Sequence, residues 1–214
     1  MRVKICGLTR LEDVNTALNE GADALGFVVD SPASPRNLAF TKAKRLMNAT
    51  RVFSTAVAVT STRDPKRMLK ICTQLRPPAL QLHYHTPALA RLIRKQAPST
   101  KLILTIQIRD RSSVKNAKRS SYYSDAILAD SPSVRGMGGT GRVADWQLAA
   151  KVRNAIAPHP LILAGGLTAK NVKTAIETVK PFAVDVSSGV ERSVGLKDHE
   201  KIRRFIMNAK ETKI

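Results

Sequence analysis

Apolar residues recur along the chain in short runs that alternate with longer segments of helical periodicity. Eight runs are rich in Val, Ile, Leu and Ala, which is typical of strands that are buried on both faces. We expect these strands at Val3–Cys6, Ala24–Val29, Val52–Val59, Ala79–Leu82, Leu102–Gln107, Ala126–Ala129, Leu161–Ala164 and Ala183–Val186.

The segments between the runs place their apolar residues at the spacing of one helix face. They predict helices at Arg10–Asn19, Thr41–Asn48, Asp64–Leu75, Pro87–Gln96, Ser112–Ser120, Ala144–Ile156, Ala169–Thr178 and His199–Ala209. Strict alternation of strand and helix predicts a parallel sheet covered by helices, and eight such units fit a closed (β/α)8 TIM barrel better than an open sheet. No linker interrupts the alternation, so we expect one catalytic barrel domain over residues 1–214.

Composition narrows the class of protein. Hydrophobic residues make up 43% of the 214 positions, as in globular proteins. Cys6 and Cys72 are the only cysteines and have no zinc-type spacing, so we expect neither a disulfide framework nor a metal site; Cys72 lies in a helical pattern and is expected in the core. With no secretory signal and no apolar run long enough to span a membrane, we expect a cytoplasmic protein without membrane contact.

The formal net charge of +20 raises the alternative of a basic barrel that binds nucleic acid. Aromatic residues make up only 4% of the chain and do not alternate with basic ones as a base-stacking surface requires. We therefore favour solvated basic helix surfaces and expect no specific nucleic-acid partner.

Several polar residues stand where predicted strands end. Cys6 ends the first strand, His83 follows the fourth, Asp130 follows the sixth, and Asp185 lies in the eighth. A barrel gathers the carboxyl ends of its strands around one mouth, where barrel enzymes carry their chemistry. Each of these residues alone also has an ordinary structural explanation. Most free cysteines, for example, are small hydrophobic residues of the core.

The loops after the last two predicted strands are suited to an anion. Gly165-Gly166 follows the seventh strand and Ser187-Ser188-Gly189 follows the eighth. In barrels this pair of loops often binds phosphate through backbone N–H groups, and glycine allows the backbone to approach closely. We favour a phosphate site here over two ordinary tight turns.

Two further loops carry candidate ligand contacts. In Ser34-Pro35-Arg36, a guanidinium held by a proline-stiffened loop is suited to a carboxylate or a phosphate, although a solvated arginine is the simpler reading. The glycine-rich segment that contains Gly138, Gly139 and Gly141 matches a dinucleotide pattern, but it does not directly follow a strand. A loop over the ligand is the better interpretation of this segment.

Six motifs, in order and spanning almost the whole chain, resemble the phosphoribosylanthranilate isomerase family of tryptophan biosynthesis. They are Lys4-Ile5-Cys6-Gly7-Leu8-Thr9-Arg10, Ser34-Pro35-Arg36, Gln81-Leu82-His83, Gly138-Gly139-Thr140-Gly141, Leu163-Ala164-Gly165-Gly166-Leu167 and Val184-Asp185-Val186-Ser187-Ser188-Gly189-Val190-Glu191. The resemblance implies a (β/α)8 barrel that performs an Amadori rearrangement of a phosphorylated, carboxylate-bearing aminoaldose without a cofactor or a metal. It leaves monomer and homodimer open.

The resemblance also implies roles. Cys6 would be the general base and Asp130 the general acid, which requires Asp130 to hold a proton near neutral pH. Arg36 and His83 would face the anthranilate, and Asp185 would line the pocket. The implied phosphate contacts are Gly165, Gly166, Ser187, Ser188 and Gly189. A related histidine-pathway isomerase remains an alternative, although those relatives carry an aspartate where Cys6 stands.

Overall fold

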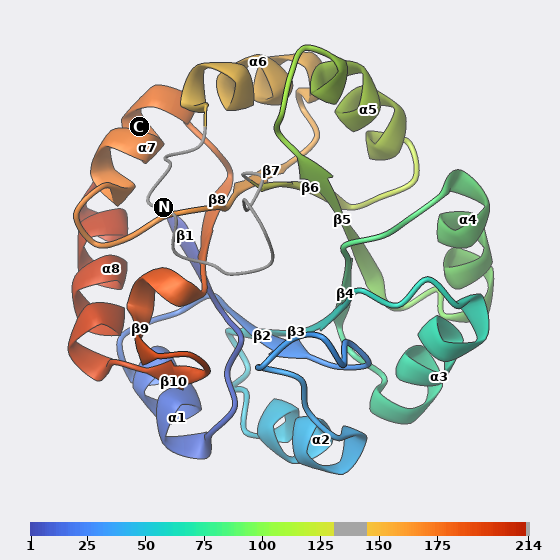
Figure 1. The fold of residues 1–214 in the computed structure, drawn as a ribbon, viewed down its shortest axis with the longest axis horizontal. Coiled ribbons are helices and arrows are strands. Elements are labelled where there is room, and N and C mark those ends of the chain that lie inside the picture. Colours follow the sequence, from blue (N-terminus) through green and yellow to red (C-terminus); the bar gives the residue numbers. More distant parts are fainter. Residues whose placement is uncertain (131–144, 213–214) are drawn as a thin grey trace.

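Eight parallel strands form the centre of the molecule. A computed structural model describes residues 1–130 and 145–212. In it the strands pair in chain order, β1 with β2 and onward, and β8 pairs back with β1 to close a barrel (Figure 1). The strands are β1 Arg2–Cys6, β2 Ala24–Val28, β3 Thr55–Thr60, β4 Ala79–Leu82, β5 Lys101–Gln107, β6 Ala126–Asp130, β7 Leu161–Leu163 and β8 Ala183–Val186. The predicted (β/α)8 barrel is confirmed.

A ring of helices surrounds the barrel, as Figure 1 shows. The helices are α1 Leu11–Asn19, α2 Phe40–Asn48, α3 Pro65–Leu75, α4 Pro87–Gln96, α5 Ser112–Ser121, α6 Trp146–Ile156, α7 Val172–Val179 and α8 His199–Glu211. Several begin where a side chain accepts a hydrogen bond from the first turn: Asp64 for α3, Thr86 for α4 and Asp198 for α8. None of the described helices is both long and apolar enough to cross a membrane.

The alternation of side chains along the strands separates two apolar layers. Val3 and Ile5 point outward and join the large cluster between the barrel and the helices. Cys6 points inward and joins a smaller cluster inside the barrel, together with Val57 and Leu128 from other strands. Because successive residues of a strand face opposite sides, Lys4 also faces the interior. The first strand thus brings an ammonium and a thiol to the inside of the barrel.

The structure corrects the predicted start of the third strand. The apolar run begins at Val52, but β3 begins at Thr55, and the side chains of Val52 and Phe53 are 92% and 97% exposed. These two residues belong to the loop that precedes the strand. Apolar character alone therefore extended the predicted strand by three residues.

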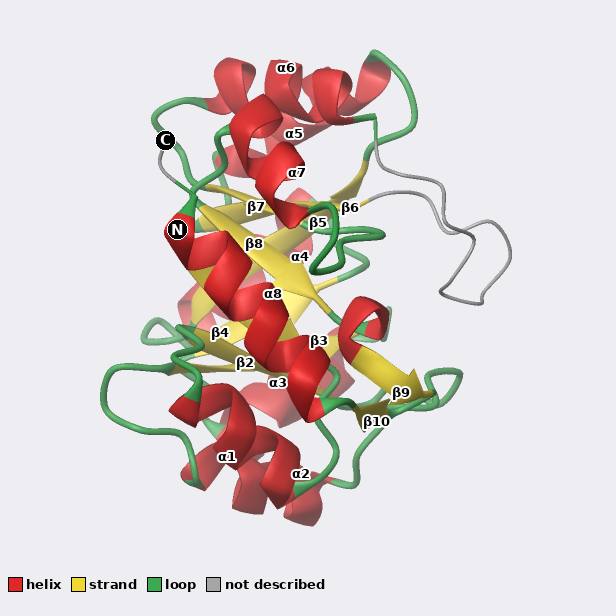
Figure 2. Cartoon of the chain, turned by 90° about the vertical axis from the view of Figure 1, so that its left-hand side faces the viewer, coloured by secondary structure: helices red, strands yellow, loops and turns green. Residues whose placement is uncertain are grey.

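A hairpin between β8 and α8 was not predicted. The short 3₁₀ helix η1 Ser188–Val190 leads into β9 Glu191–Ser193, which pairs antiparallel with β10 Leu196–Lys197. Figure 2 shows the hairpin at the end of the barrel toward which the strands point, away from the N-terminus. This is the end where the predicted site residues lie.

Candidate functional site

The two residues predicted to be catalytic lie at the same mouth of the barrel. Cys6 is the last residue of β1 and Asp130 is the last residue of β6. All strands run in the same direction, so both residues lie at the carboxyl-end face. In the closed ring β7 and β8 stand between β6 and β1 on one side and four strands stand between them on the other, which places Asp130 across the mouth from Cys6.

The Cys6 thiol is buried beside two charged side chains. It is 7% exposed, and its register partner across the β1–β2 pair is Gly26. A Cβ atom at Gly26 would lie 2.7 Å from the Cys6 sulfur, so the glycine provides the space that the thiol occupies. Below Cys6 on the same face of β1, Lys4 Nζ donates to Asp185 Oδ1 at 2.8 Å.

The charges around Cys6 act in opposite directions. Burial raises the pKa of the Cys6 thiol above its ordinary value. The positive charges of Lys4 and Lys197 lower this pKa, while the carboxylate of Asp185 raises it. Burial also works against the charge of Lys4, yet Asp185 and Cys6 outweigh it and raise the Lys4 pKa. The site therefore holds a thiol in the ligand-free protein, next to cations that favour its thiolate.

Asp130 is half-buried and is held by the last residue of β5 and the residue that follows it. Gln107 Nε2 donates to Asp130 Oδ2 at 3.1 Å, and the Ile108 amide donates to the Asp130 carbonyl at 2.8 Å. The first contact holds the carboxyl group at the edge of the mouth, and the second holds the backbone of the same residue.

His83 follows β4 at the same face. Part of the residue is exposed at the rim, and its Nε2 lies 3.5 Å from Gln81 Nε2. Desolvation by the surrounding barrel atoms lowers the pKa of His83, and the positive charge of Lys4 acts in the same direction. The imidazole is therefore neutral at neutral pH and can stack on or hydrogen-bond to an uncharged group.

The two loops predicted to bind phosphate lie against each other. Gly165 and Gly166 both adopt positive φ, at 86° and 66°, a conformation that side chains disfavour. A Cβ atom on Gly189 would lie only 1.9 Å from the Leu167 carbonyl oxygen, so the loops approach as closely as glycine permits. Asn171 anchors the first loop, because its Nδ2 donates to the Gly166 carbonyl at 3.0 Å.

Arg36 reaches the mouth from the loop between β2 and α2. Its Nε and Nη2 donate to the two carboxylate oxygens of Glu191 at 2.7 and 2.6 Å. Glu191 also accepts from Lys197 Nζ at 3.0 Å, and Lys197 Nζ donates to the Ser187 carbonyl at 2.9 Å. Burial tends to raise the Glu191 pKa, but the two cations hold it below its ordinary value.

Lys4 and Lys197 are site residues to which sequence reasoning gave no role. The position of Lys4 could have been predicted, because Lys4 is two residues from Cys6 on one strand and must face the same side. Lys197 carried none, since the hairpin that buries it is too short to show periodicity. Gly138, Gly139 and Gly141 lie outside the described residues. Among the described residues, no group of three or more His, Cys, Asp and Glu side chains is placed to hold a metal ion.

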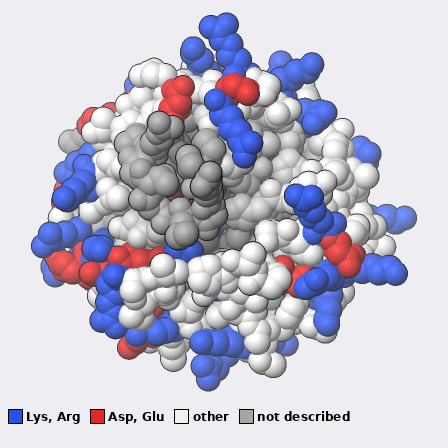
Figure 3. Space-filling view, viewed as in Figure 1, with Lys and Arg blue, Asp and Glu red and all other residues white. Residues whose placement is uncertain are grey.

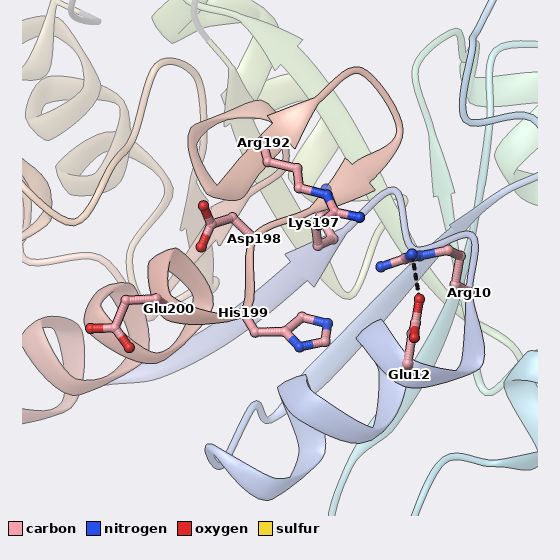
Figure 4. A pocket seen from close by; sticks show the side chains of 7 residues that line it. All are labelled: Arg10, Glu12, Arg192, Lys197, Asp198, His199 and Glu200. Atoms are coloured by element: carbon pink, nitrogen blue, oxygen red, sulfur yellow. Dashed lines mark ion pairs between the residues drawn. The ribbon is translucent and has the colours of Figure 1, made fainter.

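A surface cavity of about 400 Å³ lies outside this mouth. Figure 4 shows it between the start of α1, the hairpin and the start of α8. Its lining consists of Arg10, Glu12, Arg192, Lys197, Asp198, His199 and Glu200. Of these only Lys197 also belongs to the charged cluster at the mouth, so the cavity and the candidate site are separate surfaces that share one buried side chain.

Comparisons with known proteins point to one family. The family model described as N-(5'phosphoribosyl)anthranilate (PRA) isomerase matches residues 3–208. An N-(5'-phosphoribosyl)anthranilate isomerase from Halorubrum lacusprofundi is 40% identical over 210 residues, which cover 97% of this chain and 96% of the relative. The crystal structure of the Thermotoga maritima isomerase has a TM-score of 0.87 at 38% identity, with 98% of each chain covered. An isomerase structure in complex with reduced 1-(O-carboxyphenylamino)-1-deoxyribulose 5-phosphate has a TM-score of 0.83 at 36% identity, again with 98% of each chain covered.

Proposed function

The chain belongs to the N-(5'-phosphoribosyl)anthranilate isomerase family, and from that membership we propose a mechanism for its reaction. The protein is an isomerase of tryptophan biosynthesis. The substrate is N-(5-phosphoribosyl)anthranilate, and the product is 1-(2-carboxyphenylamino)-1-deoxyribulose 5-phosphate. One observation carries the assignment of roles: a thiol and a carboxyl end strands on opposite sides of the same barrel mouth.

Asp130 acts as the general acid and Cys6 as the general base. Asp130 donates a proton to the furanose ring oxygen, the C1′–O bond breaks, and the nitrogen lone pair forms an iminium. Cys6 then removes the proton from C2′, and the electron pair of that bond neutralises the iminium to give an enolamine. Tautomerisation of the enolamine gives the ketone. Proton transfers alone account for the reaction, because the substrate supplies its own electron sink.

The charges around Cys6 fit a base that is needed only after the first step. Burial keeps the thiol protonated in the ligand-free protein, since it raises the Cys6 pKa. The iminium brings a positive charge next to the sulfur at the moment when the proton must leave C2′. An adjacent positive charge favours the thiolate, and Lys4 and Lys197 act in the same direction.

The ends of the substrate are held away from the reacting carbons. The close-packed loops with Gly165, Gly166, Ser187, Ser188 and Gly189 bind the phosphate, and Arg36 binds the anthranilate carboxylate. His83 contacts the aromatic ring in its neutral form, and Asp185 lines the floor beside Lys4. Such remote contacts orient the pentose between Cys6 and Asp130, which converts binding free energy into rate.

A fluorescence assay tests the function directly. Purified protein should consume the fluorescent aminoaldose without added metal or cofactor, and a lack of turnover would refute the activity. Cys6→Ala and Asp130→Asn should each lower kcat by about 10²-fold or more, as expected for the loss of a general base or acid. Both variants should retain the fold and inhibition by inorganic phosphate. Near wild-type kcat in either variant would show that its assigned role is wrong.

A further inference from the structure

The hairpin after β8 places a chain of charges at the mouth of the barrel. Glu191 and Lys197 are register partners across the β9–β10 pair, and their side chains meet at 3.0 Å. Glu191 also pairs with Arg36, which is 155 residues away in the sequence. From α8, Lys201 Nζ donates to the Glu191 carbonyl at 2.8 Å and ties the hairpin to the helix.

This cluster is buried and carries an excess of positive charge. The side chains of Lys197 and Glu191 are 0% and 5% exposed, and that of Arg36 is 17% exposed. Two cations share one carboxylate, so one positive charge remains without a counter-charge inside the cluster. Buried ions are costly unless they are paired, so an excess cation at a substrate mouth is suited to the anion that arrives there.

Arg36 is held at both ends of its side chain. A Cβ atom on Gly7 would lie 2.5 Å from Arg36 Cδ, so the arginine stem packs directly over the end of β1 next to Cys6. Glu191 occupies the Nε–Nη2 edge of the guanidinium. Within the described part of the chain, the guanidinium donates its hydrogen bonds from Nε and Nη2, which leaves the Nη1–Nη2 edge for a second planar anion.

We propose that Glu191 and Lys197 are positioning residues that hold the Arg36 guanidinium by one edge and present its other edge to the carboxylate of the substrate. The inference rests on the proposed function, because it takes the anthranilate carboxylate as the group that Arg36 binds. Lys197 orients the Glu191 carboxylate and, through the Ser187 carbonyl, links the carboxylate end of the site to the phosphate loop. The hairpin thereby fixes the spacing between the two anionic ends of the substrate.

Selectivity for the carboxylate is the readout that separates positioning from a structural role. The test compares kcat/KM for N-(5-phosphoribosyl)anthranilate with kcat/KM for the corresponding aniline derivative, which lacks the carboxylate. Wild-type protein should prefer the anthranilate derivative, and Arg36→Met sets the level at which that preference is lost. Glu191→Gln, Glu191→Asp and Lys197→Met should each reduce the preference by about tenfold or more. Turnover of the aniline derivative should change much less in the two Glu191 variants. Lys197→Met should also slow that turnover, because the charge of Lys197 lowers the pKa of the Cys6 thiol.

A matched control and the contrary outcomes complete the experiment. Glu200→Gln removes a carboxylate that lines the surface cavity of Figure 4, and it should keep the wild-type preference. Equal losses for both substrates in the Glu191 variants would overturn the proposal, because they indicate a structural role only. An unchanged preference would also overturn it. No turnover of either substrate by wild-type protein would instead refute the proposed function.

A measurement on the unmodified protein covers the case in which the variants fail to fold. The Arg36 side-chain Nε–H resonance reports the edge that Glu191 occupies. The protein is titrated with reduced 1-(O-carboxyphenylamino)-1-deoxyribulose 5-phosphate. The resonance should keep the strong downfield shift of a carboxylate-bonded N–H, because the ligand binds the Nη1–Nη2 edge of the guanidinium. Loss of that shift upon binding would show that the substrate displaces Glu191, which contradicts the proposal.

Discussion

The ammonium of Lys4 lies 2.8 Å from the carboxylate of Asp185, and the two residues are register partners on neighbouring strands β1 and β8. Their side chains are 3% and 9% exposed, so the pair is shielded from water. Lys4 precedes Cys6 by two residues on the inner face of β1. Burial is the main cause of the raised Cys6 pKa; the charge of Lys4 lowers this pKa and the charge of Asp185 raises it.

Asp185→Asn should make Cys6 more reactive while it destabilises the fold. Removal of the carboxylate removes a charge that raises the Cys6 pKa, so the thiolate becomes more abundant at a given pH. It also leaves Lys4 buried without a counter-charge, which costs about 3 to 5 kcal/mol of unfolding free energy. The pH dependence of Cys6 alkylation, measured in a Cys72→Ala background, and urea denaturation check both effects. Slower alkylation in the variant would contradict this account.

Gly26→Ala should impair the reaction without weakening phosphate binding. The new methyl would lie 2.7 Å from the Cys6 sulfur and 3.0 Å from its Cα, so the thiol must move away from its position. A displacement of about 1 Å at a reacting group lowers kcat by about 10²-fold. Steady-state kinetics measure the loss, and inhibition by inorganic phosphate serves as the internal control. A variant with normal kcat would show that the sulfur position is not critical.

Gly189→Ala should weaken phosphate binding more than it lowers kcat. Its methyl would meet the Leu167 carbonyl oxygen at 1.9 Å. The oxygen is a backbone atom and the methyl is fixed on Cα, so the two loops must separate. We expect KM for the substrate and the inhibition constant of inorganic phosphate to rise together, by about tenfold or more, since the close approach of backbone N–H groups is lost. The kcat value should fall less than KM rises. Unaltered phosphate inhibition would place the phosphate elsewhere.

The sequence predicted the architecture well because a local pattern of apolar residues determines each strand–helix unit. Strands buried on both faces read as continuous apolar runs, and eight of them in alternation leave few topologies. The run that begins at Val52 misled, since Val52 and Phe53 are apolar but solvent-exposed. Local pattern cannot distinguish an exposed apolar loop from the first residues of a strand.

The candidate site was only partly predictable, for a physical reason. Positions such as Cys6 and Asp130 follow from strand ends, which the pattern locates. The ion pairs do not: Lys4 meets Asp185 from the other end of the chain, and Arg36 meets Glu191 across 155 positions. Such pairs depend on side-chain reach in the folded barrel. In addition, the hairpin that carries Lys197 is short and lacks the periodicity that reveals longer elements.

Cys72 provides a prediction for alkaline pH. Burial raises the pKa of its thiol from 9.0 to about 11. The folded state therefore keeps its proton where the unfolded chain has lost it. This contribution to stability is fully present below pH 9 and is lost as the pH rises toward 11. Unfolding free energies from urea titrations between pH 8 and 11 should fall more steeply for wild-type protein than for Cys72→Ala. Parallel curves would refute this contribution.

The basic surface should accelerate capture of the anionic substrate. The chain carries a net charge of +20, and on the face seen in Figure 3 lysine and arginine side chains lie around the periphery. A field of this sign attracts a molecule that bears a phosphate and a carboxylate, and salt screens it over about 10 Å at 0.1 M. We expect kcat/KM to fall several-fold, roughly 2- to 10-fold, between 10 and 150 mM NaCl, while kcat changes little. Sucrose of matched osmolality is the control and should leave both unchanged. A kcat/KM that does not depend on salt would show that the excess charge takes no part in substrate capture.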